Sequence, residues 1–164
     1  MNLKDWGEIP YEPSMRRTTA LLVLVAVLSA MGGRFLILPV NDGGAAILGM
    51  SYTTAAVLLV PWIENTWMLA IAQLARIFSG GPLGLFLVFT TSGFAIQERL
   101  FLYPSFPSSL PLVYVLRSWT YGPLALMAGA GLFLLLRHLG RPMDAYLAWI
   151  LWHGLWNYYW LVLA

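Results

Sequence analysis

Long apolar runs follow one another along nearly the whole chain, separated by short stretches rich in glycine, proline and polar residues. A helix of about 20 apolar residues is long enough to cross the roughly 30 Å hydrocarbon core of a membrane. We identify six apolar segments, of which the third and fifth are short: 18–38, 45–62, 66–78, 83–102, 123–136 and 143–164. This pattern predicts an all-α fold, a polytopic integral membrane helical bundle with five to six transmembrane helices.

The breaks between these segments are expected at 39–44, 79–84, 103–111 and 137–142. We expect Pro39 to stop the first helix, and the Asn, Asp and Gly residues behind it to form a turn, because these residues tolerate turn dihedrals. Pro61 is expected to end the second span. A Gly-Pro pair interrupts the apolar run 112–138. We therefore expect a short interfacial piece there, followed by a separate span from residue 123.

Composition favours a membrane protein. Of the 164 residues, 60% are hydrophobic and 10% are charged, whereas soluble domains are about one quarter charged. The net charge of +2 is too small to indicate nucleic-acid binding. The absence of cysteine excludes thiol catalysis, iron–sulfur ligation and disulfides. We expect a polar N-terminal arm over residues 1–14, which lacks the pattern of a cleavable signal peptide, and one transmembrane helical domain over residues 15–164.

The expected membrane orientation is open. Arg16 and Arg17 precede the first span, and the positive-inside rule places them in the cytoplasm. With six spans, the basic loop 137–141 would then lie outside, against the same rule. Either one segment does not cross the membrane or the rule fails for this chain, so both five and six spans are kept.

The last segment, 143–164, carries most of the residues that could do chemistry. At 100° per residue, a helix places Trp152, His153, Trp156 and Asn157 on one face, within an arc of roughly 140°. One interpretation is an aromatic belt at the membrane interface with a single interhelical hydrogen bond. The other is a binding site, because polar residues in the middle of a span usually face the bundle interior or a cavity.

Glu98 is a second candidate, since it lies between Gln97 and Arg99 near the end of the fourth span. An unpaired carboxylate inside a membrane costs several kcal/mol. Glu98 therefore either reaches the interface beside a snorkelling Arg99, or faces inward and binds a cation, a proton or a polar ligand. Neither zinc-type ligand spacing nor a phosphate-binding loop is present, so we expect no metal and no cofactor.

The first helix contains two small residues four apart, Ala26 and Ala30, and a Gly-Gly-Pro-Leu-Gly break over 80–84 separates the third and fourth segments. With six short hydrophobic segments in under two hundred residues, the chain resembles the substrate-binding S component of energy-coupling-factor (ECF) vitamin transporters. In that family a small-xxx-small motif docks on the coupling membrane subunit. The resemblance implies that Ala26 and Ala30 contact a partner, and that later helices bind a small molecule.

A second resemblance rests on His153-Gly-Leu-Trp-Asn157. This stretch looks like the HxxxN motif of CAAX-processing-type glutamic intramembrane proteases, in which glutamates and histidines activate a water. That resemblance implies Glu98 as the glutamate, where the family uses two adjacent ones. Phe133 and His138 are one residue further apart than the family's FxxxH motif.

Three functions therefore remain: the capture subunit of a small-molecule transporter, a non-catalytic accessory subunit of a larger membrane complex, and a glutamic intramembrane protease. The first is our leading expectation, and it makes the chain a non-enzyme. Any ATP hydrolysis would then come from other membrane-associated subunits, because no nucleotide motif is present. Trp side chains would stack on a planar ligand and the polar residues would bond its polar groups. The expected ligand-binding residues are Glu98, Trp119, Tyr121, Trp152, His153, Trp156 and Asn157.

Overall fold

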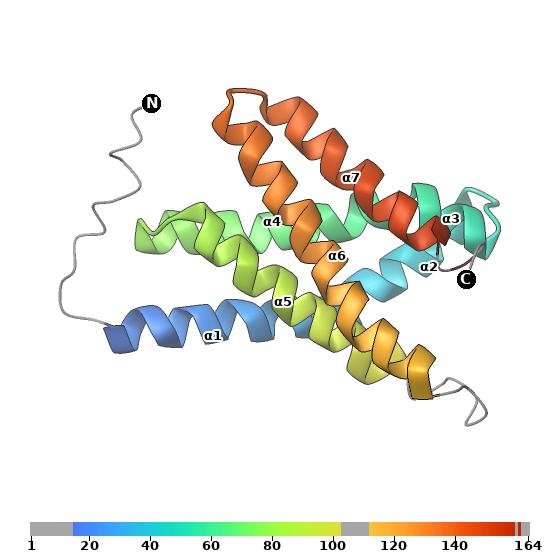
Figure 1. The fold of residues 1–164 in the computed structure, drawn as a ribbon, viewed down its shortest axis with the longest axis horizontal. Coiled ribbons are helices and arrows are strands. Elements are labelled where there is room, and N and C mark those ends of the chain that lie inside the picture. The colour runs from blue at the N-terminus through green and yellow to red at the C-terminus, as the bar shows by residue number, and fades with distance from the viewer. Residues whose placement is uncertain (1–14, 103–111, 160, 162–164) are drawn as a thin grey trace.

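A computed structural model describes residues 15–102, 112–159 and 161 (Figure 1). Every secondary-structure element in these ranges is a helix, which confirms the all-α prediction. The elements are α1 (Met15–Gly32), the π-helix η2 (Gly33–Ile37), α2 (Leu38–Ile47), α3 (Tyr52–Leu58), α4 (Val60–Ser79), α5 (Leu83–Leu102), α6 (Leu112–His138) and α7 (Pro142–Tyr158). The expected polar arm, residues 1–14, lies outside the described residues.

The first helix does not stop at Pro39, and the turn expected over 39–44 is wrong. Instead α1, η2 and α2 form one continuous helix, within which Thr19–Ile47 is apolar enough to cross a membrane. The Leu38 amide donates to the Gly33 carbonyl, an i→i−5 bond that widens the turn immediately before Pro39. A proline ring in a regular α-helix clashes with the carbonyl four residues earlier. The π-turn relieves this clash, so the helix continues.

The π-turn also keeps one side of this long helix facing the bundle. Apart from Gly32, its buried positions are four residues apart: Val25, Ser29, Gly33, Ile37 and Asn41. Four residues advance an α-helix by about 400°, so a stripe with this spacing drifts by about 40° at each step. The wider π-turn reduces that drift in the middle of the stripe. Asn41 consequently points inward although it lies sixteen residues after Val25.

The second and third expected spans are also divided differently. α2 ends at a left-handed Gly49, and α3 begins one turn later behind Ser51. α3 and α4 are separated by a 42° bend at Leu59. Pro61 begins α4 instead of ending the preceding span, because the first helical turn tolerates a residue without an amide proton. Glu64, which falls between the second and third expected segments, therefore lies inside a helix.

Ser51 is expected to contribute measurably to the stability of α3. Its hydroxyl accepts a hydrogen bond from the Thr54 amide at 3.2 Å and so caps the helix N-terminus. Removing such a cap costs about 1 kcal/mol. Ser51→Ala should lower the free energy of unfolding of the detergent-solubilised chain by about that amount. Thr53→Ala, at an exposed site in the same helix, should leave it nearly unchanged; equal losses in both variants would contradict the capping role.

The C-terminal half matches the expected boundaries more closely. The break over 79–84 is confirmed, with Gly80 left-handed at the end of α4, and α5 has the expected bounds. α6 runs through Pro123 as one helix, so the separate interfacial piece expected before residue 123 is wrong. α6 and α7 form a hairpin turned at Gly140, whose φ is 76° (Figure 1).

The helices pack around large apolar side chains from α4, α5, α6 and α7. The largest that are fully buried are Met68, Phe86, Leu87, Phe94 and Trp149. α1 lies along α5, where a Cβ added to Gly93 would come within 2.1 Å of the Ala26 carbonyl oxygen. The two backbones therefore touch directly at this crossing.

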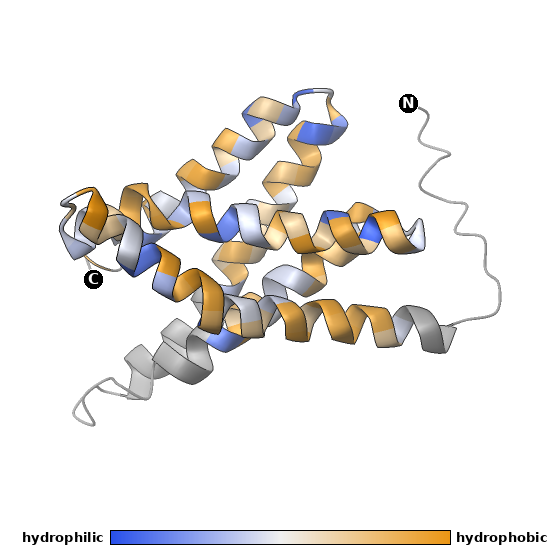
Figure 2. Cartoon of the chain, turned by 180° about the vertical axis from the view of Figure 1, so that it is seen from behind, coloured by the Kyte–Doolittle hydropathy of each residue, from blue (hydrophilic) through white to orange (hydrophobic). Residues whose placement is uncertain are grey.

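The outer side of α1 is apolar and exposed. Val23, Leu24, Val27, Leu28 and Met31 are each between 44% and 54% accessible, and hydrophobic residues cover this helix in Figure 2. Among the described residues, one helix is long and apolar enough to span a membrane, or two if α3 and α4 count as one bent span. Shorter apolar stretches occur in α5 and α6.

Candidate functional site

Four buried polar side chains meet where α2, α4 and α7 converge. They are Asn41, Glu64, Asn65 and His153, with exposed fractions of 5%, 7%, 0% and 3%. We call this group the polar cluster. Burying a carboxylate among apolar helices is costly unless other polar groups surround it. The cluster therefore needs a structural or a chemical explanation.

Glu64 is held at the centre of the polar cluster. Its Oε1 accepts a hydrogen bond from Asn41 Nδ2 at 3.0 Å. Its Oε2 lies 3.6 Å from His153 Nε2. The other ring nitrogen of His153, Nδ1, lies 2.9 Å from Asn65 Oδ1. A carboxylate and an imidazole thus face each other, each fixed from behind by an asparagine.

The separation between Glu64 and His153 decides what the pair can do. At 3.6 Å the two atoms are too far apart for a direct hydrogen bond. They are close enough to bond the same small group, such as one water molecule. A general base must lie within hydrogen-bond reach of the proton that it removes, directly or through one water. The geometry is therefore suitable for activating a water molecule.

α7 is brought to this position by its contact with the bend between α3 and α4. Pro61 has no amide proton, so the Val57 carbonyl lacks its usual helical donor. A Cβ on Gly154 would come within 2.5 Å of that carbonyl oxygen, so glycine allows the two helices to touch. Asn157 Nδ2 donates to the neighbouring carbonyl of Ala56 at 2.8 Å. Residues 153–157 thus cover the exposed backbone of the bend.

Asn157 is therefore expected to stabilise the contact between α7 and α3. Asn157→Ala removes the donor to a partly buried carbonyl, which costs about 1–3 kcal/mol. The free energy of unfolding in detergent should fall by that amount. Tyr158→Phe, which changes an exposed neighbour, serves as the control. If both variants unfold alike, the hydrogen bond to Ala56 does not contribute to stability.

The expected ligand-binding residues are only partly brought together. His153 and Asn157 face α3 and α4, as described above. Trp152 faces α6, where its indole nitrogen donates to the Ala125 carbonyl at 2.8 Å. Trp156 stacks on Tyr159 with ring centroids 6.0 Å apart. These four side chains therefore contact different neighbours. The side chains of Glu98, Trp119 and Tyr121 lie outside the described residues.

One of the two expected partner-interface residues, Ala26, lies on the α1–α5 contact. Ala26 is half-buried, and its backbone packs on Gly93 of α5. Ala30, one turn later, is also half-buried. The small residues thus permit a close contact within the chain itself. Docking of a second protein at these positions stays a prediction.

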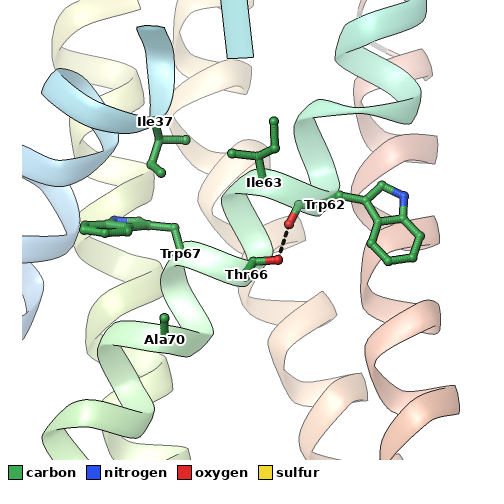
Figure 3. A pocket seen from close by; sticks show the side chains of 6 residues that line it. All are labelled: Ile37, Trp62, Ile63, Thr66, Trp67 and Ala70. Atoms are coloured by element: carbon green, nitrogen blue, oxygen red, sulfur yellow. Dashed lines mark hydrogen bonds between the residues drawn. The ribbon is translucent and has the colours of Figure 1, made fainter. Parts of the chain in front are cut away.

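A shallow apolar hollow lies between η2 and α4. It has a volume of about 390 Å³ and is lined by Ile37, Trp62, Ile63, Thr66, Trp67 and Ala70. Figure 3 shows Ile37 and Ile63 pointing towards one another across it, while the Trp62 ring turns away towards α7. There Trp62 contacts Tyr146 edge-on, with centroids 5.8 Å apart. Ile63, which lines the hollow, is the residue before Glu64 in the chain.

Sequence reasoning missed Asn41, Glu64 and Asn65. Asn41 falls in the expected turn over 39–44, and Glu64 and Asn65 fall between the second and third expected segments. A usable signal was present, because Glu64 and Asn65 lie within a long apolar stretch that continues on both sides. No protein-family model, curated protein or solved structure matches this chain.

Proposed function

We propose that this protein is a membrane-embedded hydrolase of the glutamic intramembrane protease type, with Glu64 and His153 as its reactive pair. The observation that carries the proposal is the 3.6 Å separation between Glu64 Oε2 and His153 Nε2 inside the helical bundle. His153 also belongs to the HxxxN stretch that resembles the last motif of such proteases. In this proposal the glutamate is Glu64, not Glu98.

Each residue of the polar cluster has a separate role in the proposed activation of water. Glu64 Oε2 accepts a proton from the attacking water, and the oxygen of that water forms the new bond to the scissile carbonyl carbon. Asn41 holds Oε1, which leaves Oε2 to face His153. His153 Nε2 orients the same water from the other side. The scissile C–N bond then breaks as the proton passes from Glu64 to the leaving amine nitrogen, so Glu64 returns to its carboxylate form.

A multi-pass location in the membrane is part of the proposal. The unbroken 29-residue apolar helix over Thr19–Ile47 and its exposed outer side chains support it. The bent pair α3–α4 would supply a further crossing, with its exposed carbonyls covered by α7. In hydrocarbon, irregular backbone is tolerated only where protein or a water-filled cavity surrounds it. The contacts of Gly154 and Asn157 with the bend meet that requirement.

The apolar hollow is the proposed approach for the substrate. Its walls are mainly Ile and Trp side chains, which suit an apolar peptide segment. Thr66 offers a hydroxyl at its edge, although this group is already bonded to the Trp62 carbonyl at 2.5 Å (Figure 3). A substrate seated there would lie one residue away from Glu64 along α4.

The transporter-subunit and accessory-subunit expectations remain open predictions. A capture subunit needs a ligand pocket between the later helices. The structure has a hollow beside α4 and a second one over η2 and α2, whose lining residues fall between Arg34 and Asp42. Neither hollow is lined by Trp152, His153, Trp156 or Asn157. The polar cluster, in contrast, holds a carboxylate and an imidazole that face each other at 3.6 Å. This pair supports the protease proposal.

Two measurements separate the three functions: a cleavage assay on the purified chain, and a pull-down of the native protein in mild detergent. The purified full chain, reconstituted in lipid vesicles, is incubated with a library of membrane-spanning peptides, and the products are identified by mass spectrometry. A hydrolase yields new peptide termini. A capture subunit yields no cleavage but co-purifies with an ATPase pair and a coupling membrane subunit. An accessory subunit yields no cleavage and co-purifies with subunits of another complex. Either of the last two results would overturn the proposed function.

A further inference from the structure

We propose that Asn65 is a positioning residue that fixes the proton of His153 on Nδ1, so that the lone pair of Nε2 faces Glu64. This inference rests on the proposed function, because it describes how the same site is prepared for water activation. The inference first states which nitrogen of the His153 imidazole carries the proton. The position of this proton can be measured without any substrate.

The distances around the imidazole carry the assignment. Asn65 Oδ1, an acceptor, lies 2.9 Å from Nδ1, which is an ordinary hydrogen-bond distance and requires a proton on Nδ1. Glu64 Oε2, also an acceptor, lies 3.6 Å from Nε2. A proton on Nε2 would draw the two atoms to about 2.7–2.9 Å, the usual length of a charge-assisted bond. Both distances agree with a neutral ring that is protonated on Nδ1.

Apart from its contact with His153, the Asn65 side chain makes no hydrogen bond within the described residues. It is fully buried, and its Nδ2 makes no hydrogen bond within the part of the chain that the structure describes. Burying an amide with an unbonded donor is unfavourable. A leucine of similar size would avoid that cost. The contact with His153 is therefore the one property of Asn65 that a leucine could not provide.

The contact with Asn65 determines which ring nitrogen of His153 donates a hydrogen bond and which accepts one. A neutral imidazole has one donor nitrogen and one acceptor nitrogen, and the partner of one nitrogen determines the state of the other. With Nδ1–H held by Asn65, Nε2 can accept a hydrogen bond from a water that also donates to Glu64 Oε2. Without Asn65, the ring can move its proton to Nε2, donate directly to Glu64 and close the gap. The pair would then bond to itself instead of to water.

Nuclear magnetic resonance of the ring nitrogens tests the assignment directly. The chain contains two histidines, His138 and His153. In the full-length His138→Gln variant, labelled with nitrogen-15 histidine, only His153 contributes signals. We expect a protonated nitrogen at Nδ1 and an unprotonated one at Nε2. A proton on Nε2 in this otherwise unchanged chain would overturn the proposal.

Two substitutions of Asn65 then test its role, each made in the His138→Gln background. Asn65→Asp keeps an acceptor oxygen and should preserve the proton on Nδ1. Asn65→Leu removes the acceptor and should move the proton to Nε2. An unchanged pattern in Asn65→Leu would overturn the proposal. If that variant does not fold, loss of the Nδ1 proton in a folded Asn65→Asp chain would overturn it as well.

Turnover separates this inference from the proposed function. With a cleaved peptide, Asn65→Leu should lower kcat by about 10²-fold and leave KM nearly unchanged, since water activation and not substrate binding is affected. Asn65→Asp should recover most of that loss. If the chain cleaves no peptide but the ring pattern is as expected, the proposed function fails and the positioning contact stands. If cleavage occurs with a proton on Nε2, the positioning role fails and the hydrolase stands.

Discussion

Glu64→Gln is expected to abolish hydrolysis while leaving the fold intact. Gln is nearly isosteric, and its Oε1 can still accept the hydrogen bond from Asn41. An amide, however, cannot remove a proton from water. Loss of a general base costs about 10²–10⁴-fold in rate, and kcat should fall by that factor. Because the substitution removes a buried charge, the free energy of unfolding should stay equal or increase.

The matched control is Asp144→Asn. Asp144 is also a carboxylate near the start of a helical turn, but it is half exposed and pairs with Arg141 at 2.6 Å on the surface of the hairpin. This variant should cleave peptides at the unmodified rate, measured in the same vesicles. If Glu64→Gln retains activity, or loses it only by unfolding, Glu64 is not the general base.

Gly93→Ala is expected to separate α1 from α5. The added Cβ would lie 2.1 Å from the Ala26 carbonyl oxygen, 2.7 Å from its carbon and 2.8 Å from the Ala26 Cα. These are backbone atoms, so no rotation of a side chain can relieve the clash. Overpacking of this kind costs about 1–3 kcal/mol and sometimes more. We expect a loss in the upper part of that range, visible as a lower unfolding midpoint in detergent.

Gly131→Ala is the matched control for that substitution. Gly131 is exposed in the middle of α6, and a Cβ there would meet nothing within 4 Å. Alanine is favoured over glycine in a helix by about 0.5–1 kcal/mol, so this variant should be slightly more stable. The two substitutions should therefore change stability in opposite directions. The same direction in both would show that α1 and α5 do not cross closely at Gly93.

Hydrophobic patterning was sufficient to predict the all-helical fold and several boundaries. α5 begins and ends where its apolar run does, because glycine and proline precede it and a proline-rich stretch follows. Pro39 and Pro61 were misplaced for a common reason. Proline ends a helix only when no local adjustment can accommodate its ring. A π-turn accommodates Pro39, and the start of a new helix accommodates Pro61.

The candidate site could be predicted only in part. His153 and Asn157 were recognisable because they lie in the middle of an apolar segment, where polar residues usually face the bundle interior or a cavity. The sequence could not predict that His153 meets Glu64 and Asn65, since those two residues lie 88 or more residues earlier in the chain. Asn41 faces inward only because the π-turn rotates the helix before it. Such a local change in helical register leaves no clear trace in the hydrophobic pattern.

The predicted polytopic arrangement shows a different limit of sequence reasoning. The sequence pattern treats each apolar run as a separate crossing. In the structure, the first run, 18–38, continues into α2 as one helix, and the second run, 45–62, is divided among α2, α3 and α4. Run length therefore did not correspond to helix length. Crossing number depends on where the helices bend and what covers each bend, and these features are tertiary.

The central claim is that Glu64 and His153 act as one unit on a single water. A double-mutant cycle tests it most directly, with kcat for peptide cleavage measured for the unmodified chain, Glu64→Gln, His153→Gln and the double variant. Groups that act as a unit give strongly non-additive losses. We predict that the double variant is no slower than the slower single variant. Losses that multiply, or an unmodified chain that cleaves no membrane-spanning peptide, would contradict the claim.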